Sequence, residues 1–333
     1  QDLPPSPLVW SCGDVHTKNV GSFRAPNRIA YFDADDFDDA CLAPASFDLG
    51  RAATGLLLTH GAGLTGAFLE SYAEALAQGK PYHLDAKIVR GPVKLLFERI
   101  GRRTRKKFLK AWVEDKKIRE LPEATYRLPS PARKRAQAIF EAWAKRQPHS
   151  KYYRVLDVCG STAGVGSLCQ ERYLVLVHGN KKPHILDLKE ATPSSLAAAH
   201  RTPQPKWKNE AQRMAEVQRI MQYMPIAHLG WTDTAPVSFA ITEFQPAEDR
   251  MESLELAEKD YAVFACDFGR LVAWGHLRAA GWKASPPTDA LIAFGRKLTA
   301  QPRRRILALA GDAAREITKA HRAYAATVVP EEE

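Results

Sequence analysis

Residues 12–40, with the sequence CGDVHTKNVGSFRAPNRIAYFDADDFDDA, contain two closely spaced polar motifs. A predicted strand at residues 8–12 leads into the first motif, GDVHTKN at 13–19, so Asp14 stands in the loop after a strand. Phosphoryl transfer to a hydroxyl needs a carboxylate that orients and deprotonates the acceptor, and an oxygen ligand for the metal on the phosphates. Asp14 and Asn19 match this pair, although an Asx-rich turn that caps a helix has the same composition.

The second motif, YFDADDFDDA at 31–40, has five aspartates within seven residues. Such a cluster repels itself unless a cation neutralises it, and carboxylate oxygens suit Mg²⁺. An exposed acidic turn is the alternative, but the apolar residues Ile29, Ala30 and Phe32 lead straight into the cluster. We therefore expect a metal site with Asp36 and Asp38 as ligands.

Residues 151–248 change character and are rich in β-type runs. YYRVLDVCG, SLCQERYLVLVHG and HILDLKEA are joined by GSTAGVGS and GNKKP, which predicts an antiparallel meander. A helix at about 206–224 and strands near 227–231 and 237–244 complete a five-stranded sheet with one helix. The remaining chain is mainly helical: helices are expected at 46–60, 65–78 and 92–118 and again over 252–328, with a Pro-rich linker at 121–135.

The glycines of GSTAGVGS, residues 160–167, allow backbone N–H groups to approach phosphate oxygens, although Gly-rich hairpins are also common. Lys189 lies on the next predicted strand among apolar neighbours and needs an anionic partner, for which a nucleotide phosphate qualifies. Glu210 and Glu216 on the following helix offer carboxylates to that lysine. CDFG at 266–269 looks like a metal motif of kinases, but helical spacing of the surrounding apolar residues predicts that Asp267 is structural.

Together these motifs resemble the protein kinase-like superfamily, nearest to its aminoglycoside and choline phosphotransferase branch. SCGDVHTKN is similar to that branch's catalytic loop, YFDADDFDDA to its metal motif, and Asp48 in SFDLGRAA to its helix-starting aspartate. The resemblance implies that Lys189 clamps ATP phosphates and pairs with Glu216, and that TEFQPAE is the adenine-binding hinge. The residues implied to bind the nucleotide are Gly164, Val165, Gly166, Ser167, Lys189, Glu243, Phe244 and Gln245.

The order of these motifs is permuted relative to an ordinary kinase, because the small-lobe features follow the catalytic loop. The same order occurs in a bacterial family known as domain of unknown function 2252, which the sequence resembles over most of its length. The segments that carry this resemblance are GDVHTKN, DFDDA, FDLGR, GVGSL, LKEA, RMAEVQRIMQ with HLGW, and, more loosely, GHLRA. The resemblance also implies a further segment upstream of the catalytic loop, which we expect this chain to lack or to have lost.

The expected fold is therefore α+β, a circularly permuted protein kinase-like fold with two lobes. Residues 1–148 would form the part of the large lobe with the catalytic and metal loops, 149–248 the small nucleotide-binding lobe, and 249–333 further large-lobe helices. The expected activity is transfer of phosphate from Mg²⁺-ATP to an unidentified hydroxyl, with Asp14, Lys189 and Glu216 as catalytic residues and Asn19, Asp36 and Asp38 as metal ligands. Three alternatives stay open: AMP transfer, a nucleotide-binding pseudoenzyme, and a metal-dependent phosphoesterase.

Composition narrows the class of protein. The chain has 333 residues, a hydrophobic fraction of 45% and a charged fraction of 26%, which are typical of a globular domain. It has neither an apolar run of membrane-spanning length nor a signal-peptide pattern, and its five cysteines are scattered, so we expect a cytoplasmic protein. The net charge of +10 favours a solvated, charged helical surface. Attraction to an acidic partner (a nucleotide, a nucleic acid or an anionic lipid) is the alternative, and aromatic residues are not interleaved as a nucleic-acid surface requires.

Overall fold

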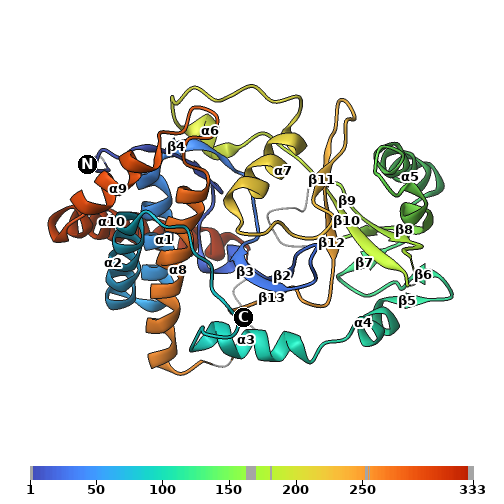
Figure 1. Cartoon of the computed structure of the whole chain (residues 1–333), viewed down its shortest axis with the longest axis horizontal. Coiled ribbons are helices and arrows are strands. Elements are labelled where there is room, and N and C mark those ends of the chain that lie inside the picture. Colours follow the sequence, from blue (N-terminus) through green and yellow to red (C-terminus); the bar gives the residue numbers. More distant parts are fainter. Residues whose placement is uncertain (1–2, 163–169, 181, 252–253, 255, 329–333) are drawn as a thin grey trace.

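The computed structural model of the chain describes residues 3–162, 170–180, 182–251, 254 and 256–328, and it has a mixed α+β architecture (Figure 1). The helices, in chain order, are α1 (Ala45–His60), α2 (Ala62–Gln78), α3 (Pro92–Gly101), α4 (Arg105–Trp112), α5 (Ser130–Ala144), α6 (Ser195–Ala199), α7 (Glu210–Met221), α8 (Glu258–Arg278), α9 (Thr288–Lys297) and α10 (Ala300–Val328). Two short 3₁₀ helices are η1 (Thr17–Asn19) and η2 (Ser150–Tyr153).

The strands are short and all their pairings are antiparallel. In chain order they are β1 (Leu8–Ser11), β2 (Val20–Arg24), β3 (Ala30–Ala34), β4 (Cys41–Pro44), β5 (Val113–Glu114), β6 (Lys117–Ile118), β7 (Thr125–Tyr126), β8 (Val155–Ser161), β9 (Arg172–Val177), β10 (His184–Glu190), β11 (Gly230–Trp231), β12 (Phe239–Phe244) and β13 (Asp249–Arg250). Three smaller sheets, β1–β4, β13–β2–β3 and β5–β6, accompany one large sheet.

Among the described residues the large sheet has six strands, in the order β11–β12–β10–β9–β8–β7, so the expected count of five is wrong. The additional strand, β7, lies within the stretch that the prolines predicted to be a linker. It adds to the sheet edge because Thr125 and Tyr126 pair with Ser161 and Gly160 of β8. A strand of two residues has no periodicity that a sequence pattern can reveal.

The helix expected over residues 92–118 is also interrupted. Helix α3 ends at Gly101, and Thr104 then caps α4 by accepting a hydrogen bond from the Lys107 amide at 3.3 Å. After α4 the chain turns back as the β5–β6 hairpin, with φ of 47° and 60° at its two central residues, Asp115 and Lys116. This is the backbone geometry that two-residue hairpins favour.

Both faces of the large sheet are covered, which explains why its strands are apolar throughout. On β9, Tyr173, Val175 and Val177 face α5, whereas Leu174 and Leu176 pack on the opposite side with side chains from α4 and β6. Helix α7 lies over the β11–β12 end of the second side, where Met214 contacts Ala240 and its neighbours. Since α4 and α7 share this side, we call it the inner face.

The remaining helices form a separate hydrophobic core at the other end of the molecule, and the β13–β2–β3 sheet lies between the two parts (Figure 1). Here α1 and α2 from the first quarter of the chain pack against α8, α9 and α10 from the last quarter. Helices α2 and α8 approach so closely that a Cβ on Gly269 would lie 2.3 Å from the Phe68 carbonyl oxygen. The glycine of CDFG is therefore explained by helix packing.

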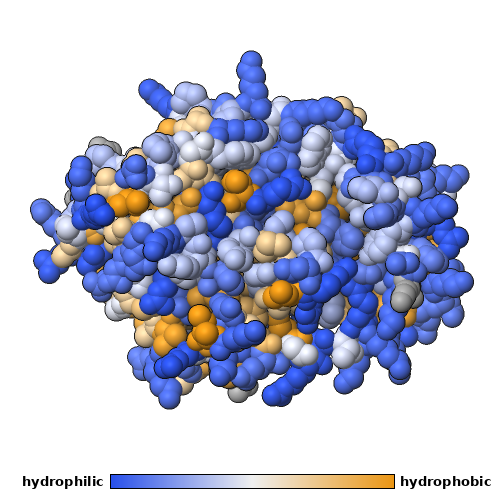
Figure 2. Space-filling model, viewed as in Figure 1, coloured by the Kyte–Doolittle hydropathy of each residue, from blue (hydrophilic) through white to orange (hydrophobic). Residues whose placement is uncertain are grey.

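Polar residues cover most of the face shown in Figure 2, and hydrophobic residues occur there in separate patches. Among the described helices, none is both long enough and apolar enough to pass through a bilayer.

Candidate functional site

The GDVHTKN loop is held in place by Gly13 and Ser11. Gly13 has a φ of 94°, and its amide donates to Ser11 Oγ at 2.8 Å. A Cβ at this position would lie 2.1 Å from the Asp39 carbonyl oxygen, so only glycine allows this loop to touch the aspartate loop. The two motifs at 13–19 and 31–40 are thus in direct contact.

Asp14 projects from this loop and remains partly accessible, with 44% of its side chain exposed. His16 Nε2 lies 3.2 Å from one carboxylate oxygen and Arg51 Nε lies 2.5 Å from the other. The hydrogen bond from His16 lowers the pKa of Asp14, Arg51 lowers it further, and together they outweigh partial burial. Asp14 is therefore ionised at neutral pH. Asn19 is linked to it, because Asn19 Nδ2 donates to the Asp14 carbonyl at 3.0 Å.

A chain of buried side chains supports the loop from below. Tyr72 OH and His276 Nδ1 are 2.8 Å apart, His276 Nε2 and Asp48 Oδ2 are also 2.8 Å apart, and Ser11 Oγ donates to Asp48 Oδ1. Tyr72, His276, Asp48 and Ser11 are each at most 1% exposed. Asp48, at the start of α1, therefore connects α2 and α8 to the Asp14 loop.

The five aspartates of residues 33–39 separate into two groups, and two of them are structural. Asp33 is buried and pairs with Arg278 of α8, with Nη2 to Oδ2 at 2.8 Å. Asp39 Oδ1 accepts from the amide of Ser195 at 2.6 Å and from its hydroxyl at 2.8 Å, which binds the start of α6. Asp35, which pairs with Arg250 at 3.2 Å, and Asp36 and Asp38 remain as candidate metal ligands.

Lys189 of β10 contacts two of these three carboxylates. Its ammonium forms an ion pair with Asp38 and lies 3.5 Å from Asp36 Oδ1. Burial lowers the pKa of Lys189, but the two carboxylates outweigh burial and leave it above its usual value. Lys189 and Asp36 therefore meet across 153 residues of sequence.

Two carboxylates of this cluster, those of Asp35 and Asp38, are only partly satisfied by hydrogen bonds from the described residues. Burial raises the pKa of Asp35 to about 6 against the effect of Arg250, and burial together with Asp36 raises that of Asp38 to about 6. One oxygen of each, Oδ1, is buried without a hydrogen-bond partner among the described residues. Unpartnered carboxylate oxygens are the donors that Mg²⁺ prefers, so these residues fit the metal that the resemblance implies. Asp35 was not among the expected ligands, because spacing alone cannot rank five neighbouring aspartates.

Arg213 of α7 fastens the aspartate loop to the large sheet. Its guanidinium is 5% exposed, and it donates to the carbonyl oxygens of Asp38 at 2.7 Å, Thr192 at 2.8 Å, and Ala40. Arg213 is the first residue of the RMAEVQRIMQ segment that carried the resemblance, but the sequence did not predict its role, because that role depends on carbonyl groups distant in sequence.

The expected ion pair between Lys189 and Glu216 is not formed. Glu216 pairs with Arg219 one turn later, with Nη1 to Oε1 at 2.5 Å. At 100° per residue, Glu216 lies on the side of α7 opposite the buried stripe of Ala211, Met214 and Gln218. It therefore points away from the sheet, and the aspartates take its place beside Lys189.

The expected hinge residues all have partners within the protein. Glu243 is buried on the outer face of β12, where its carboxylate contacts Arg28, Arg105 and His184. Phe244 faces inward against Trp112 of α4, with ring centroids 4.6 Å apart.

The third hinge residue, Gln245, links β12 to β2. Its side chain exchanges hydrogen bonds with the backbone of Arg24 at 2.8 and 3.1 Å. The expected phosphate loop, with Gly164, Val165, Gly166 and Ser167, lies outside the described residues.

Comparison with known proteins adds one finding. A family model described as "Uncharacterized protein conserved in bacteria (DUF2252)" matches residues 1–327. The chain belongs to the DUF2252 family. No curated protein and no solved structure matches it.

Two of the DUF2252 segments that carried the resemblance have clear structural roles. GHLRA, at 275–279, provides His276 for Asp48 and Arg278 for Asp33. FDLGR, at 47–51, provides Asp48 and also Arg51, which contacts Asp14. Asp267 lies within α8 and pairs with Arg270 at 2.9 Å, so the predicted helical position is confirmed.

Proposed function

We propose that this DUF2252 protein is a kinase-like phosphotransferase that uses Mg²⁺-ATP and transfers phosphate to a hydroxyl group. The observation that carries the proposal is the contact of Lys189 with Asp36 and Asp38, next to the loop that presents Asp14. A cation on a strand, a carboxylate cluster and an accessible ionised carboxylate are the parts that phosphoryl transfer requires.

The side chains have separate roles in this proposal. Asp14 accepts the hydroxyl proton of the acceptor, and His16 and Arg51 orient its carboxylate. Lys189 leaves the aspartates and contacts the phosphates when nucleotide enters. Asp35, Asp36, Asp38 and Asn19 are the oxygen donors that would hold Mg²⁺. When bound, this ion would neutralise charge on the phosphates.

Thermal-shift measurements with ATP, with and without Mg²⁺, test the proposal. The wild type should gain stability as ATP and Mg²⁺ increase together. Asp36→Ala should lose most of this gain, whereas Asp312→Ala, an exposed carboxylate on α10, should keep it. The gain should be larger at pH 8 than at pH 5, because Asp35 and Asp38 have pKa values of about 6 and protons compete with the metal below them.

A turnover assay, with slow ATP hydrolysis as the readout, separates catalysis from binding. Asp14→Ala should bind Mg²⁺-ATP like the wild type, while turnover falls by roughly 10²–10⁴-fold, because a general base acts in the transition state. Binding without any wild-type turnover would identify a pseudoenzyme instead. If no nucleotide raises the melting temperature of the wild type at millimolar concentration, the proposed function is wrong.

A further inference from the structure

A second candidate site lies on the outer side of β12. It is a cavity of about 610 Å³, large enough for a small-molecule ligand. Four segments distant in sequence form its walls, and the residues that line it are Arg24, Arg28, Arg103, Arg105, Asn180, Lys182, His184, Gln245 and Pro246.

This cavity is separate from the proposed nucleotide site. Lys189 pairs with Ala240 across the β10–β12 ladder, so both face the inner side. Successive side chains of a strand point to opposite faces. His184 is an odd number of residues from Lys189 on β10, and Glu243 is an odd number from Ala240 on β12, so His184 and Glu243 face the outer side. On β10 and β12, the residues of the two sites therefore point to opposite faces of the sheet.

Positive charge dominates the cavity. Four arginines and one lysine line it, and two carboxylates, Glu243 and Asp249, contact three of the arginines. The side chain of Arg24 donates to the carbonyl oxygen of Arg28, and no described carboxylate neutralises it. The ammonium of Lys182 is exposed and has no hydrogen-bond or ionic partner in the described part of the chain. The walls thus carry more positive than negative charge.

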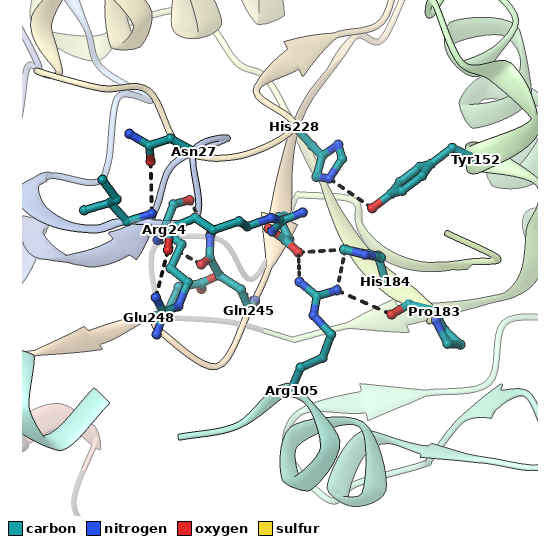
Figure 3. A network of polar contacts seen from close by, with 12 residues as sticks. Arg24, Asn27, Arg105, Tyr152, Pro183, His184, His228, Gln245 and Glu248 are labelled. Carbon is teal, nitrogen blue, oxygen red and sulfur yellow. Dashed lines mark hydrogen bonds and ion pairs between the residues drawn. The ribbon is translucent and has the colours of Figure 1, made fainter. Parts of the chain in front are cut away.

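Glu243 orients two of these guanidiniums. Its side chain is 1% exposed, with Arg28 Nη1 2.7 Å from Oε2 and Arg105 Nη2 2.6 Å from Oε1. Figure 3 shows Arg105 and His184 directed at the same carboxylate. A buried carboxylate that fixes arginines in this way pre-organises their remaining N–H groups for an anion, since planar guanidiniums match phosphate oxygens in pairs.

In this network, His184 Nδ1 cannot form favourable hydrogen bonds with both of its neighbours at once. His184 Nδ1 lies 2.5 Å from Arg105 Nη1, a donor, and 2.8 Å from Glu243 Oε1, an acceptor. If Nδ1 carries a proton, it donates to Glu243 but faces a second donor, Arg105. If Nδ1 carries a lone pair, it accepts from Arg105 but faces a second acceptor, Glu243. An anion that accepts from Arg105 Nη1 in place of His184 would leave His184 free to donate to Glu243, while Arg105 Nη2 stays on the carboxylate.

A cation is disfavoured at the same place. His184, His228 and Glu243 have ligand atoms within 4.8 Å of one another, which is the arrangement of a metal site. Arg28 and Arg105 already occupy both oxygens of the carboxylate, however, and would repel a metal ion. We propose that this cavity binds a small multiply charged anion of the oligophosphate class.

Calorimetric titration with inorganic tripolyphosphate, in EDTA and without Mg²⁺, tests the proposal on the full chain. The wild type should bind one tripolyphosphate with an affinity that falls as salt increases. The double variant Arg24→Gln/Lys182→Gln should bind at least about 10-fold more weakly, because it removes two cations that contact no carboxylate. The matched control Lys297→Gln/Arg304→Gln changes the net charge equally at exposed positions on α9 and α10 and should bind like the wild type.

A further variant separates this site from the nucleotide site. Lys189→Ala should leave tripolyphosphate binding unchanged, whether or not the protein is a phosphotransferase. The proposal is overturned if Lys189→Ala abolishes binding while Arg24→Gln/Lys182→Gln keeps it, since the anion then binds on the inner face. Equal loss in the control pair would overturn it too, because binding would then reflect overall charge alone.

Discussion

Lys189 illustrates how much a single side chain depends on its partners. Its position on an apolar strand indicated that an anion must lie nearby, and Asp36 and Asp38 fill that role. Glu216, which helical spacing also offered, instead bonds to Arg219. Lys189 thus lies between the two carboxylates, where its ammonium neutralises part of their charge.

Glu243 carries the clearest consequence for stability. Its carboxylate is buried, but His184, Arg28 and Arg105 outweigh burial and lower its pKa to about 2. Glu243→Gln should cost about 3 kcal/mol at pH 7, because two guanidiniums lose their buried partner. Because the pKa of Glu243 is lower in the folded protein than in the unfolded chain, the carboxylate stabilises the fold at pH values above its unfolded pKa. This stabilisation is lost as the pH falls toward 2.

Urea denaturation at pH 7 and pH 3 measures this effect. The difference in the free energy of unfolding between the wild type and Glu243→Gln should be smaller at pH 3 than at pH 7. Glu216→Gln is the matched control, since its partly exposed pair with Arg219 should change stability by about 0–1 kcal/mol. If this difference is the same at both pH values, the shape of the Glu243 side chain, and not its charge, stabilises the protein.

Among the helices and strands, those with long apolar patterns were predicted well and those without were not. The strands β8, β9, β10 and β12 and the helix α7 follow from their composition. The two-residue strand β7 is held by pairing with β8, and α5 begins within the expected linker, where Pro131 occupies the first turn of the helix. Local composition says little about such elements, because a neighbouring sheet stabilises them.

Helix α7 is expected to control the aspartate loop through Arg213. Arg213→Met should cost about 2–4 kcal/mol, because the carbonyl oxygens of Asp38, Ala40 and Thr192 lose buried hydrogen bonds. In this variant, hydrogen exchange of the backbone amides of residues 36–42 should accelerate more than exchange of the backbone amides of α2. Arg219→Met, at an exposed position on the same helix, is the control and should leave this loop protected. Exchange that rises equally in both variants would contradict the role of Arg213.

For the whole molecule, the helical core joins the two ends of the chain. Phe68 and Tyr72 of α2 pack with Phe268 and His276 of α8 about two hundred residues later. The Asp14 loop rests on this core through Asp48, so the candidate site depends on residues at both ends of the sequence.

Deletion of residues 258–333 should therefore abolish cooperative folding. It removes α8, α9 and α10 and exposes the apolar faces of α1 and α2. Near-ultraviolet circular dichroism and thermal denaturation provide the readout. Deletion from residue 321 onward is the control, because residues 321–327 are nearly all exposed, and it should retain the native transition. A cooperative transition in the longer deletion would show that the first 257 residues fold alone.

The sequence alone determined the α+β class, the DUF2252 family, the main strands of the large sheet and the helical setting of Asp267. These features depend on apolar periodicity and on short motifs, which are local properties of the chain. Only the tertiary structure separated Asp33 and Asp39, which contact Arg278 and Ser195, from the aspartates beside Lys189, removed Glu216 from Lys189, and assembled the basic cavity around Glu243. Those outcomes depend on which distant charges and carbonyl groups meet, and the spacing of residues along the chain does not contain that information.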